Sequence, residues 1–220
     1  MTDTYYTVEG TATASLKVDG SRFLAEAAGV TGREDVAARV RATREREHKA
    51  THHCVAYRLG AEGDTARYDD DGEPSGTAGA PILRQIDARG LTNTLVVVTR
   101  YFGGTELGTG GLARAYGDAA DAALDRASIV ERVVRTPVRL RFAYDDTAPA
   151  EAVLRQFDAT LQEEDYTAVT TWTVGVRASQ VEAFTDAFTN ALSARGEVLR
   201  VGAPGGKSGG DQTKEGPGGA

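Results

Sequence analysis

Residues 95–120 read LVVVTRYFGGTELGTGGLARAYGDAA and contain the clearest structural signal in the chain. Residues 95–100 form a continuous run rich in β-branched side chains, which is typical of a buried central strand. Residues 111–126 place leucine and alanine at helical spacing, so they predict a helix whose small side chains allow close packing on a sheet. Five glycines fall within residues 101–111, between the two elements. The stretch therefore predicts a strand, a glycine-rich loop and a helix in succession.

The glycine-rich loop formally matches the dinucleotide-binding pattern GxGxxG/A at Gly108, Gly110 and Ala113. In a dinucleotide-binding unit the glycines follow their strand almost directly, whereas seven residues separate Arg100 from Gly108 here. No Walker lysine is present either. Free backbone N–H groups at a helix N-terminus still attract anions, and Arg100 and Arg114 are near in sequence. The loop is therefore either an anion-binding helix start or a structural corner, and both interpretations stay open.

A second glycine-rich stretch, DDDGEPSGTAGAPIL, occupies residues 69–83. Thr77 is a predicted N-cap, Pro81 falls in the first helical turn, and the helix is expected to run to about Arg89 and end at Gly90. The acidic residues suit Mg²⁺ through one or two ligands, but they lack the alternate spacing of a calcium loop. They equally suit the positive end of the helix that follows, which is the favoured interpretation.

Residues 51–57 read THHCVAY and begin a strand predicted over residues 52–59. Strand alternation sends His52 and Cys54 to one face and His53 to the other, so at most two of them share an ion. The only other histidine is His48, and no CxxC or HExxH spacing occurs. The sequence therefore predicts no metal site and gives little support to a Cys–His nucleophile. The single cysteine also excludes an internal disulfide.

The remaining pattern predicts two domains. The first, residues 1–135, adds strands over residues 6–18, 23–27 and 65–70 and a helix from about residue 33 to residue 49. The second, residues 136–201, has the βαββαβ order of a ferredoxin-like fold. Its elements are predicted at residues 137–144, 149–161, 165–169, 171–177, 180–195 and 197–201, with residues 169–171 alternatively a bulge within one long strand. Residues 202–220 are rich in glycine and predict disorder.

Composition narrows the class of function. The net charge is −7, and neither predicted domain is basic, which argues against a large phosphate-binding surface while allowing a local one. No window approaches 18 consecutive apolar residues, and the N-terminus has neither the basic start nor the apolar core of a signal peptide. The sequence therefore predicts a cytoplasmic protein with no membrane segment.

Three blocks, THHCVAYRLG, DDDGEPSGTAGAPIL and VVVTRYFGGTELGTGGLARAYGDAA, resemble the IMPACT/YigZ family in their order and intervals. The segment SRF at residues 21–23 also fits, whereas Thr51 stands where many members have arginine. The resemblance covers residues 1–201 and implies an α+β protein of two domains: an Impact N-terminal domain with a ribosomal-protein-S5 domain-2-like fold, and a ferredoxin-like domain similar to an elongation-factor module. It implies, for eukaryotic members, restraint of a kinase pathway that reduces translation initiation under amino-acid stress. For the two-domain prokaryotic members, the fold suggests binding to nucleic acid or the ribosome.

The resemblance and the lack of a complete catalytic set predict a non-enzymatic factor of translation or its stress regulation. It is expected to bind RNA, the ribosome or a translation protein, without a cofactor or metal. Two alternatives stay open: an enzyme acting on a phosphorylated small molecule or nucleotide with Mg²⁺ at Asp71 or Glu73, and a pure protein-interaction module. The predicted binding surface comprises Asp71, Gly72, Glu73, Pro74, Gly76, Thr77, Gly79, Arg100, Tyr101, Phe102, Gly103, Gly104, Gly108, Gly110, Gly111 and Arg114, with His52 and His53 at its border.

Overall fold

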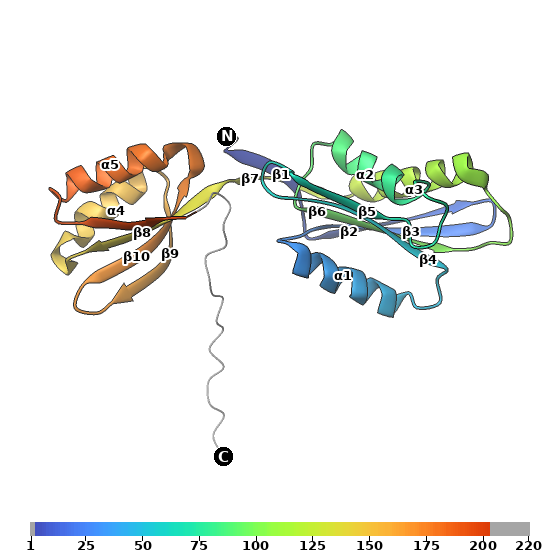
Figure 1. Ribbon diagram of the computed structural model, residues 1–220, viewed down its shortest axis with the longest axis horizontal. Helices are drawn as coiled ribbons and strands as arrows, with labels where there is room; N and C mark the ends of the chain where they lie inside the picture. Colours follow the sequence, from blue (N-terminus) through green and yellow to red (C-terminus); the bar gives the residue numbers. More distant parts are fainter. Residues whose placement is uncertain (1–2, 203–220) are drawn as a thin grey trace, which may run out of the picture. The chain divides into compact units, whose positions relative to one another are not determined.

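The computed structural model describes residues 3–202, which form two compact units (Figure 1). The division between them falls after Arg132, and the sequence pattern predicts it after residue 135. The prediction of a disordered tail lies, apart from residue 202, outside the described residues. No helix within residues 3–202 is long and apolar enough to cross a membrane.

The N-terminal unit is built on an antiparallel sheet with the strand order β2-β3-β6-β4-β5. Strand β6 (Thr94–Tyr101) lies at its centre, as predicted from the apolar run, and seven of its eight residues are buried. Strands β3 (Ser21–Gly29) and β4 (His52–Leu59) flank β6 and run antiparallel to it. Strands β2 (Thr11–Val18) and β5 (Thr65–Asp69) form the two edges.

Helices cover both faces of this sheet (Figure 1). Helices α2 (Gly79–Ala88) and α3 (Gly108–Leu124) pack on one face, around a core that includes Phe23 and Ile82. Helix α1 (Arg33–Arg46) covers the other face. The alanines of α3 lie against the sheet, as their helical spacing predicts; those that are buried are Ala115, Ala119, Ala120 and Ala123.

The strand predicted over residues 6–18 is two strands. Strand β1 (Thr4–Glu9) is followed by Gly10, whose φ of 70° is a left-handed conformation that glycine adopts without a steric penalty. After this break the chain enters β2 of the main sheet, whereas β1 pairs with β7 (Ser128–Val133) in a separate two-stranded sheet. The alternation of side chains continues across the break, so the sequence pattern alone does not reveal it.

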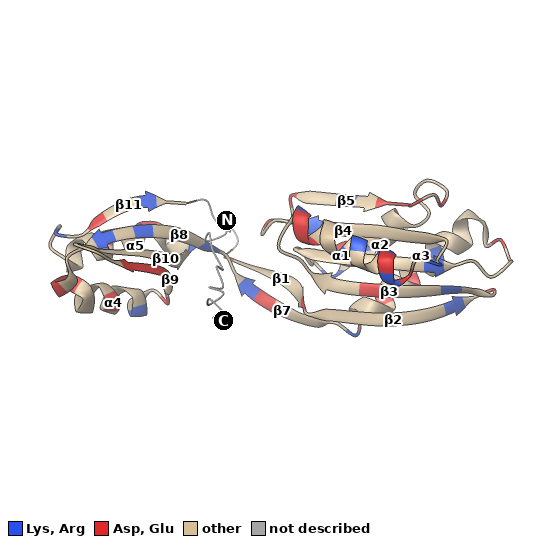
Figure 2. Cartoon of the chain, turned by 90° about the horizontal axis from the view of Figure 1, so that it is seen from below, with Lys and Arg blue, Asp and Glu red and all other residues tan. Residues whose placement is uncertain are grey.

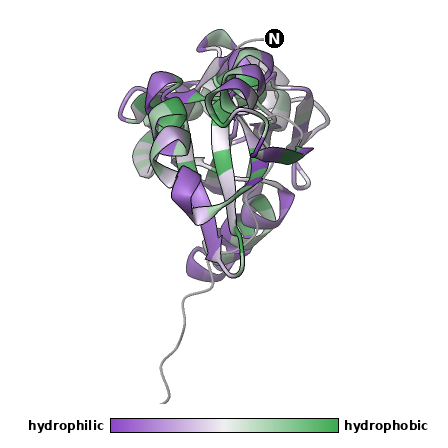
Figure 3. Cartoon of the chain, turned by 90° about the vertical axis from the view of Figure 1, so that its left-hand side faces the viewer, coloured by the Kyte–Doolittle hydropathy of each residue, from purple (hydrophilic) through white to green (hydrophobic). Residues whose placement is uncertain are grey.

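The C-terminal unit has the predicted βαββαβ order and a sheet with the ferredoxin-like order β11-β8-β10-β9. Its apolar core lies between the sheet and two helices and contains Trp172, Phe184 and Phe188. Green hydrophobic and purple hydrophilic segments occur within single helices and strands, as expected where one side is buried (Figure 3). The elements are β8 (Arg135–Phe142), α4 (Thr147–Gln156), β9 (Thr160–Tyr166), β10 (Thr170–Arg177), α5 (Val181–Ala191) and β11 (Glu197–Val201), with short 3-10 turns at Tyr144–Asp146 and Ala178–Gln180.

Two details of the C-terminal prediction are wrong. The first helix ends at Gln156 rather than near residue 161, because Asp158 adopts a left-handed φ of 50° and Ala159 N–H donates to the Leu154 carbonyl, which closes the helix. Strand β9 therefore begins five residues earlier than predicted. The chain bends between β9 and β10, so these are two strands and not one strand with a bulge. The α+β class with two domains and the ferredoxin-like order are confirmed.

Candidate functional site at the glycine-rich loops

Strand pairing brings both glycine-rich loops to the same end of the N-terminal sheet. His52, at the start of β4, pairs with Arg100, at the end of β6. Because β4 and β5 are antiparallel, the end of β5 at Asp69 lies at this end of the sheet as well. The loop of residues 70–79 follows β5 and leads into α2, and the loop of residues 102–111 follows β6 and leads into α3. Both helices therefore begin at this end.

A buried ion pair joins the first loop to the central strand. Arg100 Nη1 donates to Glu73 Oε1 at 2.7 Å, and the two side chains are 6% and 4% exposed. The Tyr116 hydroxyl, on α3, donates to the same oxygen at 2.7 Å, and burial raises the pKa of Tyr116, so the hydroxyl keeps its proton. Arg100 Nη2 donates to Ser21 Oγ at 3.3 Å. The pair thus links the first loop, β3, β6 and α3, and loss of one partner would leave a buried charge uncompensated.

Asp70 caps helix α2. Its carboxylate accepts hydrogen bonds from the backbone N–H groups of Gly76, Ala78 and Gly79 at 2.7–3.0 Å. Burial raises the pKa of Asp70, but the three hydrogen bonds outweigh burial and hold the pKa below its ordinary value. The prediction that Thr77 caps this helix is wrong, because its hydroxyl donates to a loop carbonyl at 2.6 Å. We call residues 70–79 the closed loop, since its own aspartate occupies the helix start.

Asp71 is also engaged by the protein. Arg44 Nη2 donates to Asp71 Oδ1 at 2.7 Å, and the His53 backbone N–H donates to Oδ2 at 2.6 Å. His52 Nδ1 lies 2.7 Å from the Asp71 carbonyl oxygen, so this nitrogen carries the proton that it donates. The His53 ring lies on the α1 side, 3.3 Å from the Glu47 carbonyl, and burial lowers its pKa. The two rings are on opposite faces, as strand alternation predicts.

Cys54 is fully buried beneath the closed loop. Its thiol donates to the Asp70 carbonyl at 3.1 Å. Burial raises the pKa of Cys54 to about 12, so the reactive thiolate is almost absent at neutral pH. The structure therefore gives a Cys–His nucleophile no support. Within residues 3–202, no three His, Cys, Asp or Glu side chains are grouped so that they could hold a metal ion.

The second loop, residues 102–111, differs from the closed loop in how the helix after it begins. Among residues 3–202 no side chain caps α3, and the first turn of this helix contains no acidic residue. Phe102 is 51% exposed, and nothing lies within 4 Å of the positions that a Cβ would take at Gly104, Gly108 and Gly110. The first-turn N–H groups of α3 are therefore uncapped by side chains and lie in open surroundings. We call residues 102–111 the open loop.

At Gly103 of the open loop, the close approach of another backbone segment explains why the residue is glycine. A Cβ on Gly103 would lie 1.9 Å from the Gly20 carbonyl carbon, so the open loop and the β2–β3 turn approach backbone to backbone. Gly103 N–H donates to Ser21 Oγ at 3.2 Å, which also receives Arg100. Arg100 Nε is buried close to this point and has no hydrogen-bond partner among the described residues. The Arg100 guanidinium lies 5.5 Å from the ring centre of Phe102.

The β2–β3 turn brings two basic side chains that the sequence reasoning missed. Arg22 lies over the Tyr101 ring, with 4.5 Å from its guanidinium carbon to the ring centre, and Lys17 pairs with Arg22 in the strand register. Blue basic segments lie near the shared turn of β2 and β3 in Figure 2. The hairpin signal at Asp19-Gly20 pointed to this pairing. The pairing of β3 with β6, which brings the hairpin to the open loop, has no local signal in the sequence.

The predicted surface residues divide by exposure. Some are part of the interior, others are half-buried, and the rest face outward. The buried ones are Glu73, Thr77, Gly79, Arg100 and His53. The half-buried ones are Asp71, Gly76, Tyr101, Gly111 and His52. The exposed ones are Gly72, Pro74, Phe102, Gly103, Gly104, Gly108, Gly110 and Arg114.

Comparison with known proteins identifies the family. Residues 19–124 match the Impact N-terminal domain, and residues 140–195 match a domain of unknown function, DUF1949. The IMPACT family member YvyE of Bacillus subtilis is 31% identical over 198 residues, which cover 90% of this chain and 91% of YvyE. The IMPACT family member YigZ of Escherichia coli is 37% identical over 170 residues, covering 76% and 83%. The chain belongs to the IMPACT family.

A solved structure supports the fold. It is described only as the crystal structure of a hypothetical protein, and it is 32% identical to this chain. It matches with a TM-score of 0.71 and covers 90% of this chain and 98% of its own. The two-domain α+β architecture is therefore shared with an experimental structure.

Proposed function

We propose that this chain is a translation-associated binding factor and that it binds RNA phosphates through the open loop with Lys17, Arg22 and Arg114. Membership of the IMPACT family supports the link to translation, because the resemblance implies translational control for eukaryotic members. The choice of RNA and of this surface rests on the chemistry of the open loop.

The observation that carries the proposal is the contrast between the two helix starts. Asp70 occupies the start of α2, whereas α3 begins without a side-chain cap beside an exposed aromatic ring, Phe102. Free N–H groups at a helix start attract phosphate, and an exposed ring provides a stacking face for an unpaired base.

Arg114 lies on α3, whereas Lys17 and Arg22 lie on the α1 face of the sheet, at the end where the open loop begins. Arg114, Lys17 and Arg22 make no ion pair among the described residues, and the Arg22 guanidinium lies over the Tyr101 ring. Because the whole chain carries a net charge of −7, the proposed site is local and involves few phosphates. Three phosphate contacts on a single strand predict a slope of about −2 for the logarithm of the association constant against the logarithm of salt concentration.

Fluorescence anisotropy of the full chain with a labelled single-stranded RNA tests the proposal. The Arg22→Glu, Arg114→Glu double variant is expected to weaken binding about tenfold or more, since it replaces two attractive contacts by repulsion. Arg155→Glu, on exposed α4, makes the charge change of one of these two substitutions in the other unit and is expected to change binding by less than about twofold. Absence of wild-type binding at low salt, or equal weakening by Arg155→Glu, would contradict the proposal.

The alternative of a Mg²⁺-dependent enzyme receives no support from the closed loop. Asp71 is bonded to Arg44 and His53, and Glu73 is bonded to Arg100 and Tyr116, so a metal ion would have to displace these partners. A thermal-shift screen with nucleotides and Mg²⁺ checks this. Stabilisation that disappears in Asp71→Asn would favour the enzyme over the RNA-binding factor.

A further inference from the structure

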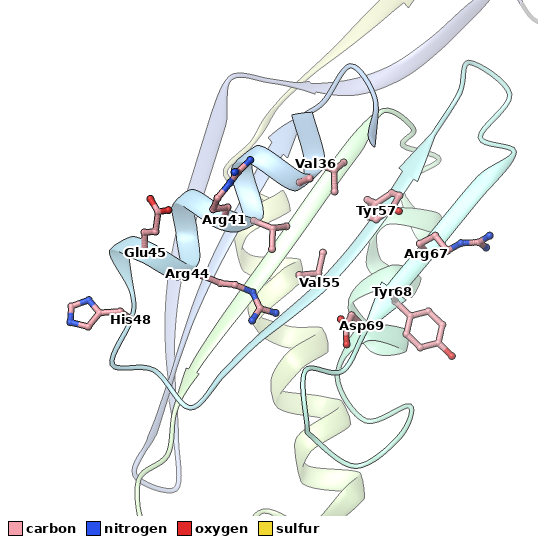
Figure 4. Close-up of a pocket in the computed structure, with 12 residues that line it drawn as sticks. Val36, Arg41, Arg44, Glu45, His48, Val55, Tyr57, Arg67, Tyr68 and Asp69 are labelled. Atoms are coloured by element: carbon pink, nitrogen blue, oxygen red, sulfur yellow. The ribbon is translucent and has the colours of Figure 1, made fainter. Parts of the chain in front are cut away.

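A groove of about 810 Å³ lies on the face of the N-terminal sheet that carries α1, away from the face that carries α2 and α3. Figure 4 shows α1 with Arg41 and Arg44 on one side of it and β5 with Arg67 and Asp69 on the other. The floor between them comes from β4. The groove is separate from the proposed RNA surface, because no residue of the open loop lines it.

The floor and the helical wall of the groove are apolar. Val55 and Tyr57 of β4 form the floor, and Val36 and Val40 of α1 form the wall. Helix α1 buries only Val36 and Thr43, and Val40 of the wall and Tyr57 of the floor stay half-buried. Apolar side chains of a partner would therefore be removed from water in this groove.

The far wall of the groove is an edge strand. Strand β5 pairs with β4 on one side, and within residues 3–202 no strand pairs with its other side. Its outer N–H and C=O groups are therefore available to an added strand. Addition of an extended peptide to such an edge supplies main-chain hydrogen bonds, and neighbouring pockets for alternate side chains supply specificity.

The charges on the rim favour an acidic partner. Arg41 makes no ion pair among the described residues, and Arg67 donates only to the Ala66 carbonyl, at 3.1 Å. These two arginines stand on opposite walls (Figure 4). Two acidic residues, Glu45 and Asp69, oppose the three arginines of the lining, Arg41, Arg44 and Arg67, so the excess charge of the lining is positive.

We propose that this groove binds an extended segment of a protein partner that pairs with the free edge of β5. In the proposed complex, apolar side chains of the segment rest on Val55 and Tyr57, and acidic side chains meet Arg41 and Arg67. The IMPACT-family chain would then carry a peptide-docking groove on the α1 face in addition to the RNA surface at the sheet end. The two sites share no side chain, so either proposal can fail without the other.

The test selects random displayed peptides of about twelve residues on the immobilised full chain and measures the affinity of the best synthetic peptide. Alternating acidic and apolar residues are expected among the selected sequences. Affinity is expected to fall about tenfold or more in the Arg41→Glu, Arg67→Glu double variant and in Ala37→Trp, which fills the groove from an exposed helix position. Arg33→Glu, on the same helix but outside the groove, makes one of these charge changes as a control and is expected to bind normally.

Hydrogen exchange of the peptide complex distinguishes strand addition from simple burial. The amides of β5 are expected to exchange more slowly with peptide bound, because its free edge becomes hydrogen-bonded. The proposal is overturned if no peptide is enriched, if the enriched peptides lack acidic residues, or if they bind the double variant as tightly as the wild type. It is also overturned if β5 amides do not respond, or if the chain forms a dimer that the double variant dissociates, since a second copy would then fill the groove.

Discussion

In the closed loop, three backbone N–H groups donate to the Asp70 carboxylate, whereas in the open loop the first turn of α3 has no side-chain cap. Both loops are rich in glycine, and both lead into a helix at the same end of one sheet. Glycine content reports where the backbone is free to turn, and it does not report whether the resulting N–H groups are available. In the closed loop Asp70 accepts these N–H groups, which stabilises the fold, and the open loop is the one that we propose binds a ligand.

The largest effect is expected from breaking the ion pair that anchors the closed loop. Arg100→Met leaves Glu73 buried without its cation, which is expected to destabilise the N-terminal unit by about 3–5 kcal/mol. Urea unfolding of the full chain measures this. The Glu73→Gln, Arg100→Met double variant removes the uncompensated charge and is expected to recover part of the loss. A single variant as stable as the wild type would mean that the pair does not anchor the loop.

A smaller effect is expected from the cap of the closed loop. Asp70→Ala removes the acceptor for three N–H groups and is expected to cost about 1–2 kcal/mol. The pKa of Asp70 is lower in the folded state than in the unfolded state, where it is near 3.8. The stability that the ionised carboxylate adds to the fold is therefore fully present above pH 3.8 and is lost as the pH falls through the folded-state pKa. The stability difference between wild type and variant is therefore expected to be constant near neutral pH and to shrink in acid. A difference that grows as the pH falls below 3.8 contradicts this assignment.

The smallest effect on stability is expected from closing the open loop. Thr109→Asp places a carboxylate in the uncapped first turn of α3, where it is expected to stabilise the helix by about 0.5 kcal/mol. The same carboxylate competes with phosphate for the helix start, so RNA affinity is expected to fall while stability rises. Thr109→Asn, without the charge, is the control. RNA binding that is unchanged by the aspartate would separate the open loop from the RNA site.

The sequence predicted the elements that have a local signal. The apolar run of residues 95–100 located the central strand, and strand alternation placed His53 and Cys54 on opposite faces correctly. The early end of α4 depends on a single left-handed residue, Asp158, for which the sequence pattern gave no indication. Local propensity therefore located most elements, and their boundaries depended on individual turns.

The partners within the site could not be predicted in the same way. Glu73 and Arg100 are 27 residues apart and meet only because β5 and β6 lie on either side of β4. Three consecutive aspartates occupy residues 69–71, at the end of β5 and the start of the closed loop, and the fold of the loop selects Asp70 as the cap. Composition identifies the carboxylates but not which amide each one reaches. For this reason the sequence assigned both loops to one predicted binding surface, although an aspartate caps the helix start in only one of them.

A nitrogen–proton NMR titration of the full chain with single-stranded RNA compares the two loops most directly. The amide signals of Gly104, Gly108 and Gly110 are expected to shift as RNA is added, because Gly104 lies in the open loop and the other two lie in the first turn of α3. The signals of Gly76 and Gly79 are expected to stay in place, because Asp70 holds those N–H groups. Shifts centred on Gly76 and Gly79, with the open loop unaffected, would contradict the assignment of a structural and a ligand-binding loop.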